Sequence, residues 1–159
     1  YHALSCWQFT PACASQFRAR LVWLSGPHGL AMPGVGPGTW DKLLDSGQLH
    51  DLLGWLNLKE EQLANTPGFG ARSASQLHQS LQNARTKPFA TWLRALGLPL
   101  DNTPRPLADW NNLAARNARQ WQAEAGVSAR RGEQLQAFFR HPEVLALRAE
   151  LKAQEISGF

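Results

Sequence analysis

The sequence predicts an all-α fold in which short glycine turns join successive helices. Apolar residues recur at helical spacing along most of the chain, and no stretch alternates apolar and polar residues long enough to form a strand. A Gly-hydrophobic-Gly triplet also occurs twice, at 34–36 and 68–70, and each copy is followed by apolar residues at the same offsets. This duplication predicts tandem helix-hairpin-helix motifs.

Helical spacing defines the expected elements of the first half of the chain. Phe17, Leu21 and Leu24 form one apolar stripe, which predicts a helix at that point. Thr39 is expected to cap the next helix, because a threonine hydroxyl accepts a hydrogen bond from the first turn. The expected helices are 16–24, 39–44, a short one beginning at 59–61, 73–84 and 89–96, with an apolar patch over 49–56.

Prolines and Gly126 divide the second half. Three prolines fall between 98 and 106, which predicts a loop there, and Gly126 interrupts the helical pattern that follows. The expected helices are 107–124, 130–140 and one from Pro142, followed by a loose tail over 156–159. Trp40, Trp92 and Trp110 lie among apolar neighbours and are expected in the core rather than stacked on bases.

Charge and length narrow the function classes. The chain has 159 residues, with 16 Lys and Arg against 12 Asp and Glu, a net charge of +4 and a sequence pI near 9.6. That length holds one domain or two small ones. The positive excess suits a polyanionic partner, although an ordinary basic protein would look the same.

The sequence carries no membrane or secretion signal. No run reaches the roughly 18 apolar residues of a transmembrane helix, and the N-terminus lacks a secretory pattern. A cytoplasmic location without a membrane partner is therefore expected. The chain begins with Tyr1 rather than Met, which suggests a piece of a longer protein.

The two glycine triplets are the candidate binding elements. From the second glycine of each, four residues on gives Trp40 or Ala74, and seven on gives Leu43 or Leu77. Glycine allows a ligand to approach the main chain closely, and the helix start that follows offers unpaired N–H groups to a phosphate. The sequence does not favour a dinucleotide-binding fold, because that fingerprint needs a third glycine and a preceding strand.

The predicted DNA contacts follow from this geometry. Backbone amides around each hairpin are expected to face a phosphate, and three basic side chains nearby are candidate contacts, with solvated surface charges as the alternative. The amides belong to Gly34, Val35, Gly36 and Gly38 and to Gly68, Phe69, Gly70 and Ala71, and the side chains to Lys42, Arg72 and Lys87.

A weaker third copy and a relic extend the repeat. Gly126-Val127-Ser128 has the same frame, with Ser128 in place of the second glycine. The segment 98–102 lacks the glycines, so it is either a relic of a hairpin or an interhelical loop.

Several segments resemble the helix-hairpin-helix domain of bacterial NAD-dependent DNA ligases. The similar segments are "MPGVG" at 32–36, "LKEEQLANTPGFG" at 58–70, 73–77, "KPF" at 87–89 and "RALGLP" at 94–99. The segment "ARLVWLSGPHGL" at 19–30, with the degenerate later hairpins, is more similar to a branch found in enteric and related bacteria than to the main replicative enzyme.

The resemblance implies a parent enzyme that seals nicks in DNA replication and repair. Members of that family adenylate a lysine with NAD, pass AMP to the 5′-phosphate and join it to the 3′-hydroxyl. The adenylated lysine lies in a Lys-x-Asp-Gly motif, which is missing here, so the chain itself is expected to be non-catalytic. Its implied role is sequence-independent binding of duplex or nicked DNA, beside the adenylation and OB-fold domains of the parent.

The resemblance also implies domain boundaries and a question about zinc. Residues 1–29 are similar to part of a ligase zinc finger, degenerate or truncated, and 30–159 to the DNA-binding domain. A structural zinc takes four ligands, whereas this segment offers only Cys6 and Cys13. Free thiols are the favoured interpretation of the two cysteines, and a zinc site is the alternative.

Two other function classes remain open at this point. The hairpins also suit a module of another DNA repair or nuclease complex. A helical protein-interaction domain, in which the hairpins only pack, would fit the degenerate later copies.

Overall fold

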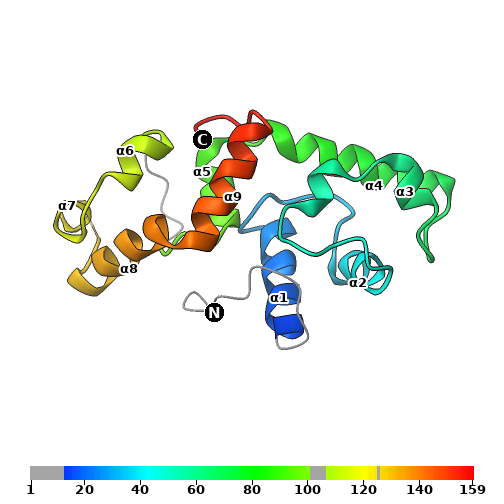
Figure 1. The fold of residues 1–159 in the computed structure, drawn as a ribbon, viewed down its shortest axis with the longest axis horizontal. Helices are drawn as coiled ribbons and strands as arrows, with labels where there is room; N and C mark the ends of the chain where they lie inside the picture. The colour runs from blue at the N-terminus through cyan, green and yellow to red at the C-terminus, as the bar shows by residue number, and fades with distance from the viewer. Residues whose placement is uncertain (1–12, 101–106, 125) are drawn as a thin grey trace. The chain divides into compact units, whose positions relative to one another are not determined.

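The all-α prediction is confirmed in a computed structural model that describes residues 13–100 and 107–159, except 125. Within these ranges every regular element is an α-helix or a 3-10 helix, and no strand occurs (Figure 1). None of the helices in this part of the chain has the length and apolar character needed to cross a bilayer.

The chain divides into two compact units, one ending at Lys87 and the other running from Pro88 to Phe159. This division does not test the predicted domain boundary between 1–29 and 30–159, which stays a prediction. The first unit contains α1 (Ala14–Ser25), α2 (Pro37–Asp45), η2 (Gly54–Asn57), α3 (Glu60–Ala64), α4 (Ala71–Asn83) and η3 (Ala84–Thr86).

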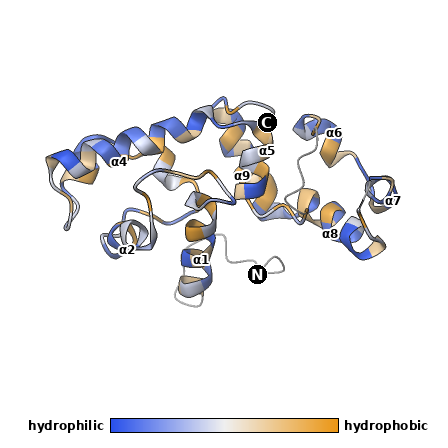
Figure 2. Ribbon diagram, turned by 180° about the vertical axis from the view of Figure 1, so that it is seen from behind, coloured by the Kyte–Doolittle hydropathy of each residue, from blue (hydrophilic) through white to orange (hydrophobic). Residues whose placement is uncertain are grey.

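The core of the first unit forms where α1 packs against α2. Trp40 is fully buried, and its Nε1 donates to Ser25 Oγ at 2.9 Å, so the indole nitrogen keeps a partner inside the core. Trp55 is also fully buried, with its ring centroid 6.3 Å from that of Trp40. The long helix α4 buries one stripe and exposes a hydrophilic face, as Figure 2 shows.

The second unit contains α5 (Phe89–Ala95), α6 (Trp110–Ala114), α7 (Ala118–Gln122), α8 (Ala129–Arg140) and α9 (Pro142–Ala153). Aromatic rings fill its core: Trp121 stacks on Phe139 at 5.7 Å, and Trp110 meets Phe139 edge-on at 4.9 Å. The core positions predicted for Trp40, Trp92 and Trp110 are confirmed, since each is at most 3% exposed.

The continuous helix predicted over 107–124 is wrong. Two short helices occur instead, because polar side chains cap a new start within the segment. Asn117 Oδ1 accepts from the Gln120 amide and Gln120 Oε1 accepts from the Asn117 amide, both at 2.9 Å, which is a capping box. Asp109 caps α6 through its side chain, which accepts a hydrogen bond from the Asn112 amide at 3.0 Å.

Two further expectations are corrected. Thr39 does not cap α2, because the helix begins earlier, with Gly36 as its N-cap and Pro37 as its first residue. The tail is docked rather than loose: Ile156 is 3% exposed and the Phe159 ring lies 4.9 Å from Phe89. Ile156 closes α9 through a hydrogen bond to the Leu151 carbonyl at 3.0 Å.

Candidate nucleic-acid interface

The first unit presents two turns of the same construction. In the first, the Val35 amide donates to the Met32 carbonyl at 3.3 Å, and Gly34 has a φ of +73°. In the second, the Phe69 amide donates to the Thr66 carbonyl at 3.2 Å, and Gly68 has a φ of +94°. Each is a Pro-Gly turn in which proline fixes the first corner and glycine supplies the positive φ of the second.

A helix begins immediately after each turn. Gly36 is the N-cap of α2 and Gly70 the N-cap of α4, and both are extended, with φ of −138° and −100°. Because glycine has no side chain to cap the helix, first-turn donors such as the amides of Gly38 and Ala71 stay available to other acceptors. This is the arrangement that the duplicated triplets predict.

The structure revises the set of available donors. Val35 and Phe69 use their amides to close their own turns, and the Gly70 amide donates to Ser73 Oγ at 2.9 Å. Among the residues that the structure describes, the amides of the other predicted donors have no hydrogen-bond acceptor. These are Gly34, Gly36 and Gly38 in the first hairpin and Gly68 and Ala71 in the second.

The main chain at these turns is open to a ligand. A Cβ atom built at Gly36, Gly38 or Gly70 would meet nothing within 4 Å. Gly34 faces equally open space, whereas Gly68 lies against the side chain of Lys42. The first hairpin therefore exposes its backbone on one side, and the second hairpin exposes the start of α4.

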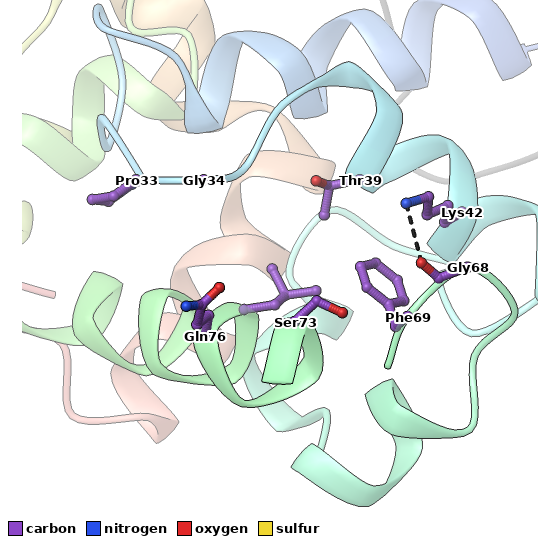
Figure 3. A pocket seen from close by; sticks show the side chains of 9 residues that line it. Pro33, Gly34, Thr39, Lys42, Gly68, Phe69, Ser73 and Gln76 are labelled. Atoms are coloured by element: carbon purple, nitrogen blue, oxygen red, sulfur yellow. Dashed lines mark hydrogen bonds between the residues drawn. The ribbon is translucent and has the colours of Figure 1, made fainter. Parts of the chain in front are cut away.

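A cleft of about 250 Å³ separates the two hairpins. Pro33, Gly34, Thr39 and Lys42 line it from the first motif, and Gly68, Phe69, Ser73, Gln76 and Leu77 from the second. Figure 3 shows Lys42 reaching across to the Gly68 carbonyl, with the Phe69 ring beside it. Lys42 is the charged residue among these described lining residues, and none of them is acidic.

The three predicted basic contacts have different surroundings. Lys42 Nζ donates to the Gly68 carbonyl at 3.3 Å and lies 5.0 Å from the centre of the Phe69 ring. Arg72 is exposed in the first turn of α4, beside the open amides, and Lys87 is half-buried at the end of the unit.

Sequence reasoning missed three polar residues that line the cleft, Thr39, Ser73 and Gln76. It also missed Ser80, whose hydroxyl bonds to the Pro33 carbonyl of the first turn. Ser73 could have been found, because it occupies the third helical position after Gly70, from which a side chain bonds back to the N-cap amide. No sequence pattern near Gln76 or Ser80 indicated that these residues lie near the hairpins.

The second unit contains a third turn that a backbone hydrogen bond closes over the same span, with a glycine of positive φ. The Val127 amide donates to the Glu124 carbonyl at 3.3 Å, and Gly126 has a φ of +80°. Ser128 differs from the glycines at this position, because its Oγ accepts from the Arg131 amide at 3.1 Å and so caps α8 internally. The Arg131 amide is therefore not available to a phosphate in this hairpin.

Gly97 ends α5 rather than beginning a helix. Its amide bonds to the Arg94 carbonyl at 3.0 Å, and the Leu98 amide bonds to Leu93 at 3.1 Å, which is a Schellman ending. The rest of the suggested relic, from 101, lies outside the described residues.

The free-thiol interpretation is wrong for Cys13, which is disulfide-bonded. A disulfide sulfur is not a thiolate, the form in which cysteine binds zinc. Cys6 lies outside the described residues. Within the ranges described, no three His, Cys, Asp or Glu side chains are grouped closely enough to hold a metal ion.

Comparison with known proteins shows that the chain is similar to part of two longer proteins. No protein-family profile matches it. It is 55% identical over 159 residues to a protein named DNA ligase B from Pseudomonas fluorescens (strain Pf0-1) and 44% identical over 160 residues to DNA ligase B from Pseudomonas putida (strain W619). All of the chain aligns, and it spans 28% of the length of each relative. Over its whole length the chain therefore matches a segment of DNA ligase B, and the resemblance predicted from its sequence is confirmed.

Proposed function

We propose that this chain is the part of an NAD-dependent DNA ligase that holds duplex DNA, without regard to sequence, through the open amides of its hairpins. The parent enzyme seals nicks in the cytoplasm during DNA repair or replication, while its adenylation and OB-fold domains carry out the chemistry. The observation that carries the proposal is the pair of matched turns, each leaving unbonded amides at an exposed helix start.

The electrostatics of the first unit support a phosphate ligand. A helix start carries a partial positive charge and unpaired N–H groups, which together favour an anion. Arg72 adds a full charge beside the open amide of Ala71. Backbone contacts of this kind position a protein on a duplex but read no bases.

Salt dependence tests the proposal directly. If two to four phosphates are neutralised, the logarithm of the binding constant should fall with the logarithm of salt concentration at a slope of about −1.8 to −3.6. Fluorescence anisotropy with a labelled duplex should give a dissociation constant of order micromolar or weaker at moderate salt. Equal affinity for duplexes of unrelated sequence is also expected.

The glycine variants identify the surface. Gly36→Val and Gly70→Val should fold normally, because both positions are extended and a Cβ there meets no neighbour. The new side chains would occupy the space in front of the open amides, so the double variant should bind duplex at least about tenfold more weakly. Circular dichroism should show unchanged helix content. Unchanged DNA binding would remove the mechanism.

The alternatives give different results in two assays. A protein-interaction domain would show no salt-dependent shift of nicked or intact duplex. A module of another repair or nuclease complex would bind DNA, but its parent would not seal nicks with NAD. Assay of the parent protein on nicked DNA with NAD therefore separates the ligase role from both.

A further inference from the structure

Two side-chain contacts join the hairpins of the first unit. From α2, Lys42 Nζ donates to the Gly68 carbonyl at 3.3 Å, and its methylene carbons lie 3.0 Å from a Cβ built at Gly68. From α4, Ser80 Oγ donates to the Pro33 carbonyl at 2.9 Å. Ser80 is only 8% exposed, so its hydroxyl sits in a defined environment.

The two contacts are reciprocal. The turn of the second hairpin is held by a residue from the helix of the first, and the turn of the first by a residue from the helix of the second. They bridge sequence separations of 26 and 47 residues, so neither follows from local structure. Both turns border the same cleft, with Pro33 and Gly34 on one side and Gly68 on the other.

We propose that Lys42 and Ser80 are positioning residues that fix the spacing between the two turns, so that one duplex is held at two points at once. This inference rests on the proposed function. Once the first turn has bound a phosphate, the second turn binds the same duplex as an intramolecular step. The effective concentration for that step is highest when the distance between the two turns already matches the distance between the two phosphates. A preset separation also avoids the entropy cost of ordering the turns on binding.

A direct phosphate contact by Lys42 is the competing role, and salt separates the two. Neutralising a phosphate releases counterions, so losing a direct contact would reduce the salt slope by about 0.9. Losing a positioning contact lowers affinity but leaves the slope unchanged, because the same phosphates are still engaged. The two roles therefore differ in a measurable quantity.

The variants remove each contact with little other change. Lys42→Met keeps an unbranched side chain beside Gly68 and Phe69 but loses the ammonium group. Ser80→Ala loses only the hydroxyl. Lys152→Met on α9 and Ser75→Ala on α4 are matched controls, because both residues are exposed and neither lines the cleft.

The experiment compares two backgrounds with a labelled duplex. In the wild-type background, Lys42→Met and Ser80→Ala should each weaken binding about 5- to 20-fold with an unchanged salt slope, and the controls less than twofold. In a Gly36→Val background, where the first hairpin can no longer bind a phosphate, the same changes should alter affinity less than twofold. A structural defect would instead lower affinity by the same factor in both backgrounds.

Hydrogen exchange in the free protein provides a second readout. Lys42→Met should accelerate exchange of the Phe69 amide, and Ser80→Ala that of the Val35 amide, because these amides close the turns that the side chains hold. Equal losses in both backgrounds, or a smaller salt slope, would overturn the positioning role while leaving DNA binding in place. Wild-type protein that binds no duplex would overturn both proposals.

Discussion

Arg18 and Asp41 form a bidentate pair on the surface of the first unit. Arg18 Nε donates to Asp41 Oδ1 at 2.6 Å and Nη2 donates to Oδ2 at 3.1 Å, which ties α1 to α2. Hydrogen bonding by the guanidinium holds the pKa of Asp41 below its ordinary value of 3.8, with a smaller contribution from the charge of Arg18. The pair is exposed, so its contribution to stability is small.

The lowered pKa of Asp41 predicts a pH-dependent contribution to stability. A depressed carboxyl pKa stabilises the fold above the unfolded value, and that stabilisation is lost as pH falls through the folded value. Asp41→Asn should therefore be less stable than wild type near pH 7, and the difference should close below about pH 4. Urea unfolding at several pH values measures this. Arg18→Met should show the same closing gap, and a gap that widens in acid would contradict the assignment.

Gly132 allows α7 and α8 to pack in direct backbone contact. A Cβ at this position would lie 2.6 Å from the Ala118 carbonyl oxygen, which is backbone and cannot move aside cheaply. Gly132→Ala should destabilise the protein by about 1–3 kcal/mol, measured by urea unfolding. Gly38→Ala is the matched control: its Cβ meets nothing within 4 Å, so it should be neutral or stabilising by about 0.4–1 kcal/mol.

At the scale of elements, the helix ends were harder to predict than the helices. The apolar stripes located α1, α4, α8 and α9, because one face of each is buried and their spacing is regular. The break between α6 and α7 was missed because polar caps, Asn117 with Gln120, override a continuing apolar pattern. The docked tail was missed because aromatic contacts such as that of Phe159 with Phe89 join residues far apart in the sequence.

In the candidate site, too, local features could be predicted from the sequence and contacts between distant residues could not. The Pro-Gly pairs predicted both turns. The same pairs could have shown that the amides of Val35 and Phe69 form the hydrogen bonds that close these turns. The contacts of Lys42 with Gly68 and of Ser80 with Pro33 could not be predicted, since they depend on how two separate motifs pack.

The start of α8 offers a test of the weakened hairpin. Ser128 caps this helix through Oγ, so Ser128→Ala should cost about 1 kcal/mol of stability. Ser128→Gly restores the residue found at Gly36 and Gly70 and should cost only a few tenths of a kcal/mol. Urea unfolding of both variants measures the difference. Equal losses would mean that the serine hydroxyl does not cap the helix.

At the scale of the whole molecule, the proposed function assigns DNA binding to this chain and the adenylated lysine to another part of the parent protein. None of its lysines lies in a Lys-x-Asp-Gly motif. Incubation with NAD should therefore leave the mass of the protein unchanged by mass spectrometry, with the full parent protein as the positive control. A mass gain equal to AMP would contradict this prediction.

The space around Gly36, Gly38 and Gly70 is empty, so the need for glycine in folding can be distinguished there from the need for glycine in DNA binding. No neighbouring atom excludes a side chain at these positions, so a mutational library sorted for soluble expression should recover many residue types there. The same library sorted for DNA retention should recover almost only glycine. Few positions in a small protein would differ so sharply between the two sorts, and those that do would outline the surface on which the duplex rests.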